Sequence, residues 1–252
     1  MPYIFSREEV LALIEAVTRH EDRNMWGAML RALALVLYCT GMRLGEAARL
    51  RIDDVDLRQR ILTVQRSKGR SRILPIRDDL VAELQEYLRR RVEVLAASGV
   101  GASPAMFLRR DGSALTLQAA SNVLRGLLRD LGMKPPRGRA GARPYEFRHA
   151  FAVHRLTARA VEGVDVHAQL PRLSAYLGHV NVLGTEVYLK ATPELLELAS
   201  QRFEQQARGK GRPSRAVRLR AACSVTCSRT SLSTSRGSAV PACTRCAPTA
   251  TR

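Results

Sequence analysis

The chain has 252 residues, of which 46% are hydrophobic, and this is enough for one sizeable core with a small appendage. No apolar run approaches the ~20 residues of a membrane span, and acidic residues precede the first apolar run, which argues against membrane insertion and export. The formal net charge of +18 predicts a polyanionic partner. Ten of the positive charges lie between Arg208 and Arg252, where no acidic residue occurs, so the remainder carries +8.

Two helices are predicted near the N-terminus. Ser6 to Glu9 forms a capping box, and apolar residues at helical spacing follow it, which predicts a helix over residues 7–19. These apolar residues are Val10, Leu13, Ile14 and Val17. Residues 25–38 are almost wholly apolar, so a second helix should cross the core and stop at Thr40 and Gly41. Cys39 is predicted to be a small core residue.

The segment T-G-M-R-L-G-E-A-A-R-L, from Thr40 to Leu50, predicts a helix end, a turn and a short helix over 44–50. Gly41 can end the preceding helix in the left-handed conformation. Arg43 then lies on the turn, where Glu46 is close enough in sequence to hold its guanidinium group. A solvent-exposed ion pair between Arg43 and Glu46 is the alternative interpretation.

A β-hairpin is predicted next. Residues 61–65 and 72–76 alternate or run apolar like short strands, after a loop over 52–56, and the charged turn Ser67 to Arg70 joins them. Lys68 in this turn is one of only four lysines in the chain. Since lysine can lose its proton and arginine cannot, Lys68 is a candidate for proton transfer. A solvated turn lysine is the alternative.

Two more helices are predicted over 78–97 and 116–131, with a Gly/Pro/Ser-rich loop over 98–105 after the first. The apolar side of the first helix comprises Leu80, Leu84, Tyr87, Leu88 and Val92. Residues 134–144, K-P-P-R-G-R-A-G-A-R-P, are predicted to be irregular. This basic segment either contacts a DNA backbone or is a solvated connector.

Between Tyr145 and Tyr188 the chain gathers residues that can bind or attack a phosphate. The clusters Y-E-F-R-H-A-F-A-V-H-R-L and Y-L-G-H-V-N-V-L-G-T-E-V-Y contain Arg148, His149, His179 and Tyr188. Arginine forks onto phosphate oxygens, histidine donates a hydrogen bond or a proton, and a phenol can serve as nucleophile. The stretch therefore predicts phosphoryl transfer, with a core aromatic role for Tyr188 as the alternative.

The first of these clusters predicts a helix that enters at Pro144 and ends around residues 162–165. Phe147 and Phe151, four residues apart, form its core stripe, so Arg148 should point elsewhere, towards a cleft. The two remaining histidines of this region, His154 and His167, are predicted to be surface or hydrogen-bonded structural residues.

The second cluster predicts two short helices. Pro171 should open the first, and Gly178 should end it, which would place His179 at the mouth of the cleft. Thr185 is predicted to be the N-cap of the second, with Tyr188 one turn into it. A further helix after Thr192 either packs onto its own core or docks onto a neighbouring protomer.

Four sequence motifs follow one another in the same order as in the tyrosine recombinase (phage integrase) family. They lie around Arg43, Lys68, Arg148 and the pair His179 and Tyr188. The resemblance to this family extends from about Phe5 to Phe203. This resemblance implies an α+β fold, mainly α-helical with a small antiparallel β-hairpin or sheet. It places the catalytic domain at residues 1–207, without the family's usual N-terminal core-binding domain. Residues 208–252 are predicted to be a disordered basic tail, and its cysteines Cys223, Cys227, Cys243 and Cys246 permit a zinc site that no surrounding scaffold supports.

The resemblance also implies the chemistry. Tyr188 would attack a DNA phosphodiester to form a 3′-phosphotyrosyl bond, and Lys68 would protonate the leaving oxygen, with no metal or other cofactor required. The residues implied to contact the phosphate are Arg43, Arg148, His179 and Tyr145, supported by Glu46 and His149. Tyr145 stands where the family motif H-x-x-R has histidine, and a phenol with a pKa near ~10 is a poor proton shuttle at neutral pH.

The implied partner is double-stranded DNA, bound by a tetramer of this chain or of this chain with related recombinases. We expect a bacterial, cytoplasmic and nucleoid-associated protein from a mobile element. Two alternatives remain: a truncated, catalytically impaired DNA-binding remnant of such a recombinase, and a type IB topoisomerase-like nicking enzyme.

Overall fold

The computed structural model describes residues 3–19, 25–67, 70–99, 101–135, 137, 140–179, 181–186, 188, 197, 200 and 204. The chain divides into two units, Met1–Ser200 and Gln201–Arg252, and the described helices and strands belong to the first. Lys68 and the tail with its four cysteines lie outside the described residues, and of the helix predicted after Thr192 only residues 197, 200 and 204 are described, as helical.

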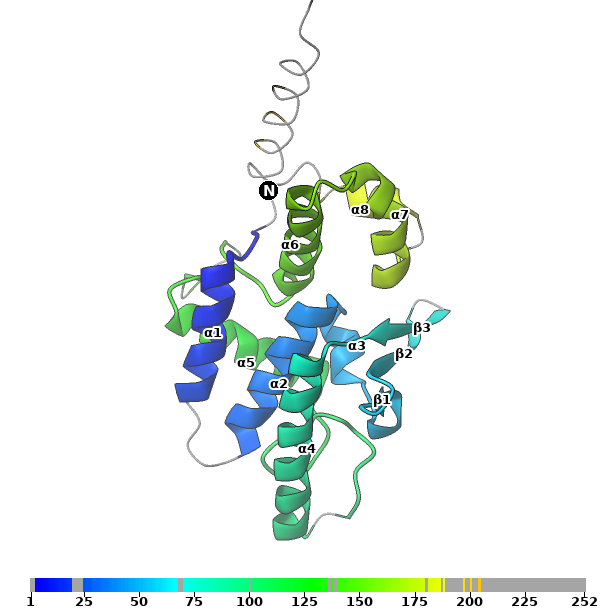
Figure 1. The fold of residues 1–252 in the computed structure, drawn as a ribbon. Helices are drawn as coiled ribbons and strands as arrows, with labels where there is room; N and C mark the ends of the chain where they lie inside the picture. The colour runs from blue at the N-terminus through cyan, green and yellow to red at the C-terminus, as the bar shows by residue number, and fades with distance from the viewer. Residues whose placement is uncertain are drawn as a thin grey trace, which may run out of the picture. The chain divides into compact units, whose positions relative to one another are not determined.

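The described part of the first unit is mostly helical with one small sheet, as predicted (Figure 1). The elements are α1 (Arg7–Arg19), α2 (Met25–Thr40), α3 (Leu44–Ala48), a 3₁₀ turn (Ile52–Asp54), β1 (Val55–Asp56), β2 (Ile61–Ser67), β3 (Arg70–Pro75), α4 (Asp78–Ser98), α5 (Leu117–Asp130), α6 (Glu146–Val161), α7 (Val166–Leu177) and α8 (Leu183–Glu186).

Helix α2 is the centre of the larger hydrophobic core. It packs against α1, α4 and α6, and its buried residues include Met29, Leu33 and Leu37 (Figure 1). The capping box predicted for α1 is confirmed: the Ser6 amide donates to Glu9 Oε2 at 2.8 Å, and the Glu9 amide donates to Ser6 Oγ at 3.1 Å. The apolar pattern of the first two helices therefore positions the α2 C-terminus, from which the site is built.

The sheet is antiparallel in the order β1-β2-β3. Leu62 pairs with Leu74, and both are buried, while Ile73, which precedes Leu74 in β3, is exposed. The loop predicted over 52–56 is wrong, because residues 52–54 form a 3₁₀ turn and Val55 and Asp56 pair with β2 as a short edge strand. The alternation along β3 sets which of its side chains reach the core, and hence which can reach the site.

Helix α4 buries Leu80, Leu84 and Tyr87 as predicted, but Val92 is 64% exposed. The prediction for Val92 is wrong because Arg91, and not Val92, faces the interior at this turn of α4. The Arg91 guanidinium donates to the carbonyls of Ser103 and Ala105 at 2.6 and 2.7 Å. The loop after α4 is thus fixed by hydrogen bonds to main-chain oxygens rather than by apolar contacts.

Two further predictions are corrected by the structure. Cys39 is exposed, because it lies on the side of α2 away from the core although its neighbours in sequence are apolar. Helix α7 begins at Val166, since the Asp165 side chain accepts a hydrogen bond from the His167 amide at 2.9 Å, and Pro171 lies inside the helix instead of opening it. The helix tolerates Pro171 with the loss of one backbone hydrogen bond.

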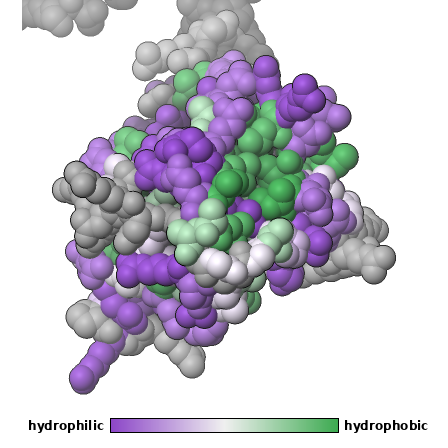
Figure 2. Space-filling model, turned by 90° about the horizontal axis from the view of Figure 1, so that it is seen from below, coloured by the Kyte–Doolittle hydropathy of each residue, from purple (hydrophilic) through white to green (hydrophobic). Residues whose placement is uncertain are grey.

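Hydrophilic residues cover most of the face in Figure 2, around a smaller hydrophobic area. Among the described residues, no helix is both long and apolar enough to span a membrane.

Gly41 ends α2 with a φ of +61°, and a Cβ atom here would lie 2.9 Å from Phe151 Cγ and 3.0 Å from Leu177 Cδ2. We expect Gly41→Ala to lower the free energy of unfolding by about 2 to 5 kcal/mol, from backbone strain together with overpacking. Gly132 has a φ of +70° and no atom within 4 Å of its would-be Cβ, so Gly132→Ala should cost only about 1 to 2 kcal/mol. Urea unfolding of both variants checks the difference, and equal losses would contradict it.

Candidate active site

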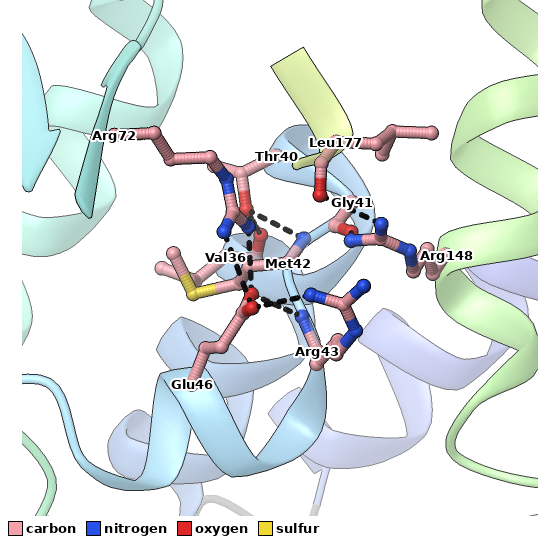
Figure 3. Close-up of polar contacts among 9 residues, drawn as sticks. All are labelled: Val36, Thr40, Gly41, Met42, Arg43, Glu46, Arg72, Arg148 and Leu177. Carbon is pink, nitrogen blue, oxygen red and sulfur yellow. Dashed lines mark hydrogen bonds and ion pairs between the residues drawn. The ribbon is translucent and has the colours of Figure 1, made fainter. Parts of the chain in front are cut away.

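The site begins at the turn between α2 and α3. The Thr40 hydroxyl donates to the Val36 carbonyl at 2.5 Å and accepts from the Met42 amide at 3.3 Å, so the chain leaves α2 in a fixed direction (Figure 3). Arg43 follows as the N-cap residue of α3, with extended backbone angles. The predicted left-handed end at Gly41 and the predicted helix start at Arg43 are both confirmed.

Glu46 holds Arg43 in place, as predicted. One carboxylate oxygen accepts from Arg43 Nη1 at 2.8 Å, and the other accepts from the Arg43 main-chain amide at 2.9 Å (Figure 3). The Glu46 side chain is only 2% exposed, so the pair is not the solvated surface pair that was the alternative. Hydrogen bonds and positive charge must compensate a buried carboxylate for the loss of water, and Arg43 provides both for Glu46.

Arg72 of β3 is the second cation on the same carboxylate, and sequence reasoning missed it. Its Nη2 and Nη1 atoms donate to the two Glu46 oxygens at 2.7 and 3.2 Å, which is a bidentate pair (Figure 3). The only signal in the sequence is an arginine at an inward position of the second strand of the hairpin. Because this pair joins residues 26 apart across two elements, local spacing does not reveal it.

Arg148 lies in the interior rather than pointing into an open cleft, which corrects the prediction. It is 1% exposed and donates to the Gly41 carbonyl at 2.8 Å and to the Leu177 carbonyl at 2.7 Å (Figure 3). Burial lowers the pKa of its guanidinium, and the nearby positive charge of Arg43 lowers it further. Arg148 thereby ties the end of α2 to the end of α7.

Tyr188 lies in the same interior region. It is 2% exposed, in a turn two residues beyond α8 and not within a helix as predicted. Its ring lies 5.2 Å from the His149 ring and 6.2 Å from the His179 ring, between centroids. Burial raises the pKa of the Tyr188 phenol, and the charge of Arg148 partly opposes this.

His179 follows Gly178, the left-handed residue that ends α7 as predicted. Its Nδ1 lies 2.7 Å from Thr185 Oγ1, and this hydrogen bond fixes the ring in its half-buried position. Thr185 is buried within α8 and is not its N-cap, because its hydroxyl is used to orient His179. The prediction for Thr185 is therefore wrong, whereas His179 does meet Tyr188.

Tyr145 and His149 complete a row of rings that continues to Tyr188. Tyr145 is 47% exposed, and its ring centroid lies 4.9 Å from that of His149. His149 Nε2 lies 3.5 Å from Glu146 Oε2. Burial, followed by the charge of Arg148, lowers the pKa of His149, and burial raises the pKa of Glu146. Burial therefore opposes the charged form of both side chains in this pair.

A basic cleft of about 480 Å³ opens beside Tyr145. It is lined by Leu44, Ser121, Arg125, Arg129, Lys134, Arg143, Pro144 and Tyr145. No carboxylate is among these residues, so the cleft attracts anions. The irregular segment predicted over 134–144 contributes Lys134, whose Nζ donates to the Ala140 carbonyl at 2.9 Å, and Arg143.

The structure thus brings together Arg43, Glu46, Arg148, His149, His179, Tyr188 and Tyr145 from segments far apart in sequence. Lys68 lies outside the described residues, so its predicted role stays a prediction. His154 bonds to Tyr38 at 2.9 Å, and His167 is exposed, as predicted. Among the described residues no group of three His, Cys, Asp or Glu side chains could hold a metal ion.

The lowered pKa of His149 has a consequence for stability. His149 resists protonation in the folded state, so its pKa difference between the folded and unfolded states contributes to the free energy of unfolding. This contribution is complete above the unfolded pKa of about 6.5. It is lost as the pH falls below that value, by at most about 1.4 kcal/mol per pH unit. His149→Gln should therefore lose less unfolding free energy than wild type between pH 7.5 and 5.5. Urea unfolding at both values measures this, with the exposed His167→Gln as control. Identical losses in wild type and His149→Gln would contradict it.

Comparison with known proteins identifies the family of the chain. The family model described as "Phage integrase family" matches residues 4–194. The putative integrase/recombinase y4rB of Sinorhizobium fredii is 33% identical over 210 residues, covering 81% of this chain and 66% of the relative. Tyrosine recombinase XerD of Mycobacterium leprae is 34% identical over 200 residues, covering 78% of this chain and 59% of the relative. The chain thus spans less than two thirds of the length of these relatives.

Solved structures show the same fold. The crystal structure of XerA recombinase superposes with a TM-score of 0.63 and 26% identity, covering 84% of this chain and 66% of the other. XerH site-specific recombinase bound to palindromic difH substrate gives a TM-score of 0.61 at 24% identity, over 81% of this chain and 54% of the other. Because the family model matches residues 4–194, which is most of this chain, the chain belongs to the phage integrase family.

Proposed function

We propose that this chain cuts and rejoins double-stranded DNA at specific sites through a 3′-phosphotyrosyl intermediate, as a tyrosine recombinase. The observation that carries the proposal is the meeting of Tyr188, Arg148, His179 and Arg43, which come from separate segments of the chain and are all residue types that can bind or attack a phosphate. Its family and its similarity to tyrosine recombinases support the same reaction.

In this reaction the Tyr188 phenol releases its proton to water and its oxygen attacks the phosphorus of a phosphodiester. The bond from phosphorus to the 5′ oxygen breaks, and the 3′ phosphate remains on Tyr188. The 5′ hydroxyl of a partner strand then attacks the phosphotyrosine and restores both the phosphodiester and the phenol. Arg43 and Arg148 offset the negative charge that builds on the phosphoryl oxygens, where one such group is worth about 3 to 4 kcal/mol. The phosphotyrosyl bond conserves the energy of the phosphodiester.

Proton transfer is assigned to the remaining groups. Lys68 protonates the leaving 5′ oxygen, and His179, fixed by Thr185, donates a hydrogen bond to a phosphoryl oxygen. Tyr145 contributes a hydrogen bond only, since a phenol is a weak acid at neutral pH. Glu46 and His149 support Arg43 and the Tyr188 ring.

The described structure is a closed state of this site. Tyr188 is buried, so its phenol cannot reach a phosphodiester on the surface without a rearrangement of the α7–α8 region. DNA that binds beside Tyr145 supplies the anion and the binding energy for that change. We therefore expect cleavage to depend on assembly on DNA and not on encounter alone.

The wider setting is proposed on the same basis. Residues 1–207 form the catalytic domain and residues 208–252 a basic tail, and the active unit on DNA is a homo-tetramer or a tetramer with related recombinases. Because nucleoid DNA is the substrate, the protein works in the bacterial cytoplasm, and a mobile element is the source of its target site.

A catalytically impaired remnant is the second candidate, and Tyr145 is the observation that favours it. It replaces the histidine of the H-x-x-R motif, and no described side chain within the ring row replaces that histidine as an acid near the phosphate, since burial lowers the pKa of His149. Such a protein would bind DNA and leave it intact.

The test is covalent trapping. The protein is incubated with nicked suicide DNA fragments from its own genomic flanks and run on a denaturing gel, beside Tyr188→Phe and the exposed-ring control Tyr145→Phe. We expect a shifted protein–DNA band in wild type and in Tyr145→Phe, and none in Tyr188→Phe. If all flanks are bound and none gives a band, the remnant is the correct interpretation.

The basic cleft generates a separate prediction. In a Tyr188→Phe background, Arg125→Ala and Arg129→Ala should each weaken binding of the flanking DNA at about 150 mM salt and lower the slope of log Kd against log salt by about 1. Arg89→Ala is the matched control, because Arg89 pairs with Glu86 and Glu93 on α4 and is not a lining residue of the cleft. If the slope of log Kd against log salt is unchanged in all three variants, the DNA binds outside this cleft.

A further inference from the structure

Arg72 is a partly buried arginine that the proposed reaction does not use. Its side chain is 12% exposed and reaches from β3 to the carboxylate of Glu46, which it grips through both Nη atoms (Figure 3). Ile73, the next residue along the strand, is exposed, so the side-chain alternation of β3 directs Arg72 inwards.

Gly178, the glycine before His179, leaves room for this arginine. A Cβ atom at position 178 would lie 3.0 Å from Arg72 Nη1, 3.2 Å from Cδ and 3.3 Å from Cζ. The Arg72 guanidinium therefore lies against the end of α7 on one side and binds Glu46 on the other. It connects three parts of the site: the hairpin that carries Lys68, the α2–α3 turn and the turn that carries His179.

The Glu46 carboxylate is shared by two guanidinium groups in unequal ways. Arg72 takes both oxygens in a fork, whereas Arg43 takes one oxygen with its side chain and the other with its main-chain amide. A fork on both oxygens restrains the plane of the carboxylate, and it does so from β3, whereas the contacts of Arg43 come from the same turn as Glu46. The orientation of Arg43 thus depends on Arg72 through Glu46.

Two positive charges on one carboxylate also leave the cluster with an excess charge of +1, which suits an anionic phosphate. We propose that Arg72 is a positioning residue for DNA cleavage, which fixes the Glu46 carboxylate so that Arg43 meets the scissile phosphate in one orientation. This inference rests on the proposed function, and it assigns Arg72 no contact with DNA.

The first test needs no DNA target. Crystal structures of Arg72→Met and of the control Arg77→Met, which removes an exposed arginine paired with Asp79 just after β3, compare the position of Arg43. We expect the Glu46 carboxylate to rotate and the contact between Arg43 Nη1 and Glu46 Oε1 to be lost in Arg72→Met and kept in Arg77→Met. An Arg43 position unchanged in Arg72→Met overturns the proposal, whether or not the protein cleaves DNA. Should Arg72→Met fail to crystallise or fold, Arg72→Lys is analysed in the same way.

The second test separates positioning from binding. With a nicked suicide fragment that wild type cleaves, the single-turnover rate of adduct formation should fall about 10- to 100-fold in Arg72→Met, and less in Arg72→Lys, while Kd changes less than about threefold. In a Glu46→Gln background the same substitution should change the rate less than about threefold, because Arg72 acts through that carboxylate. An undiminished effect in that background, or a loss confined to Kd, would overturn the proposal. Absence of an adduct in wild type contradicts the proposed function instead, and the crystallographic comparison then decides the role of Arg72.

Discussion

The hydrogen bonds from the buried Arg148 to two main-chain carbonyls hold the site together. Gly41 belongs to the end of α2 in the larger core, and Leu177 belongs to the smaller core cluster of α6, α7 and Tyr188. One guanidinium group therefore joins two hydrophobic clusters at the point where their helices end. Carbonyls at helix C-termini lack intrahelical partners and carry partial negative charge, so they suit a buried cation. Arg148, which the proposed chemistry requires for its charge, therefore also fixes the geometry of the site.

Around this centre the site is arranged as a set of compensated charges. Glu46 balances Arg43 and Arg72, while burial keeps Glu146 and His149 towards their neutral forms. The net result is a positive interior beside the row of rings that ends in Tyr188. A phosphate entering this space would meet groups already oriented, which is how electrostatic preorganisation lowers a barrier. Because Tyr188 is buried, the proposed nucleophile has to be released before it can react.

Much of this could be predicted from the sequence, and the omissions have physical reasons. Local signals, such as the Ser6 capping box, the left-handed Gly41 and the pairing of Arg43 with Glu46, are confirmed because each depends on residues a few positions apart. Arg72 was missed because its partner is 26 residues away and is set by the register of the hairpin. The exposure of Cys39 could not be read from an apolar run without clear periodicity, and Thr185 forms its hydrogen bond with His179 instead of capping α8.

The central claim is that Tyr188, and not the exposed Tyr145 of the same ring row, becomes covalently bonded to DNA. The direct measurement is mass spectrometry of the trapped protein–DNA adduct after digestion with nuclease and protease, which identifies the modified peptide and the attached nucleotide. The account predicts a nucleotide joined through its 3′ phosphate to Tyr188. A nucleotide on Tyr145 or any other residue, or one joined through a 5′ phosphate, would contradict it.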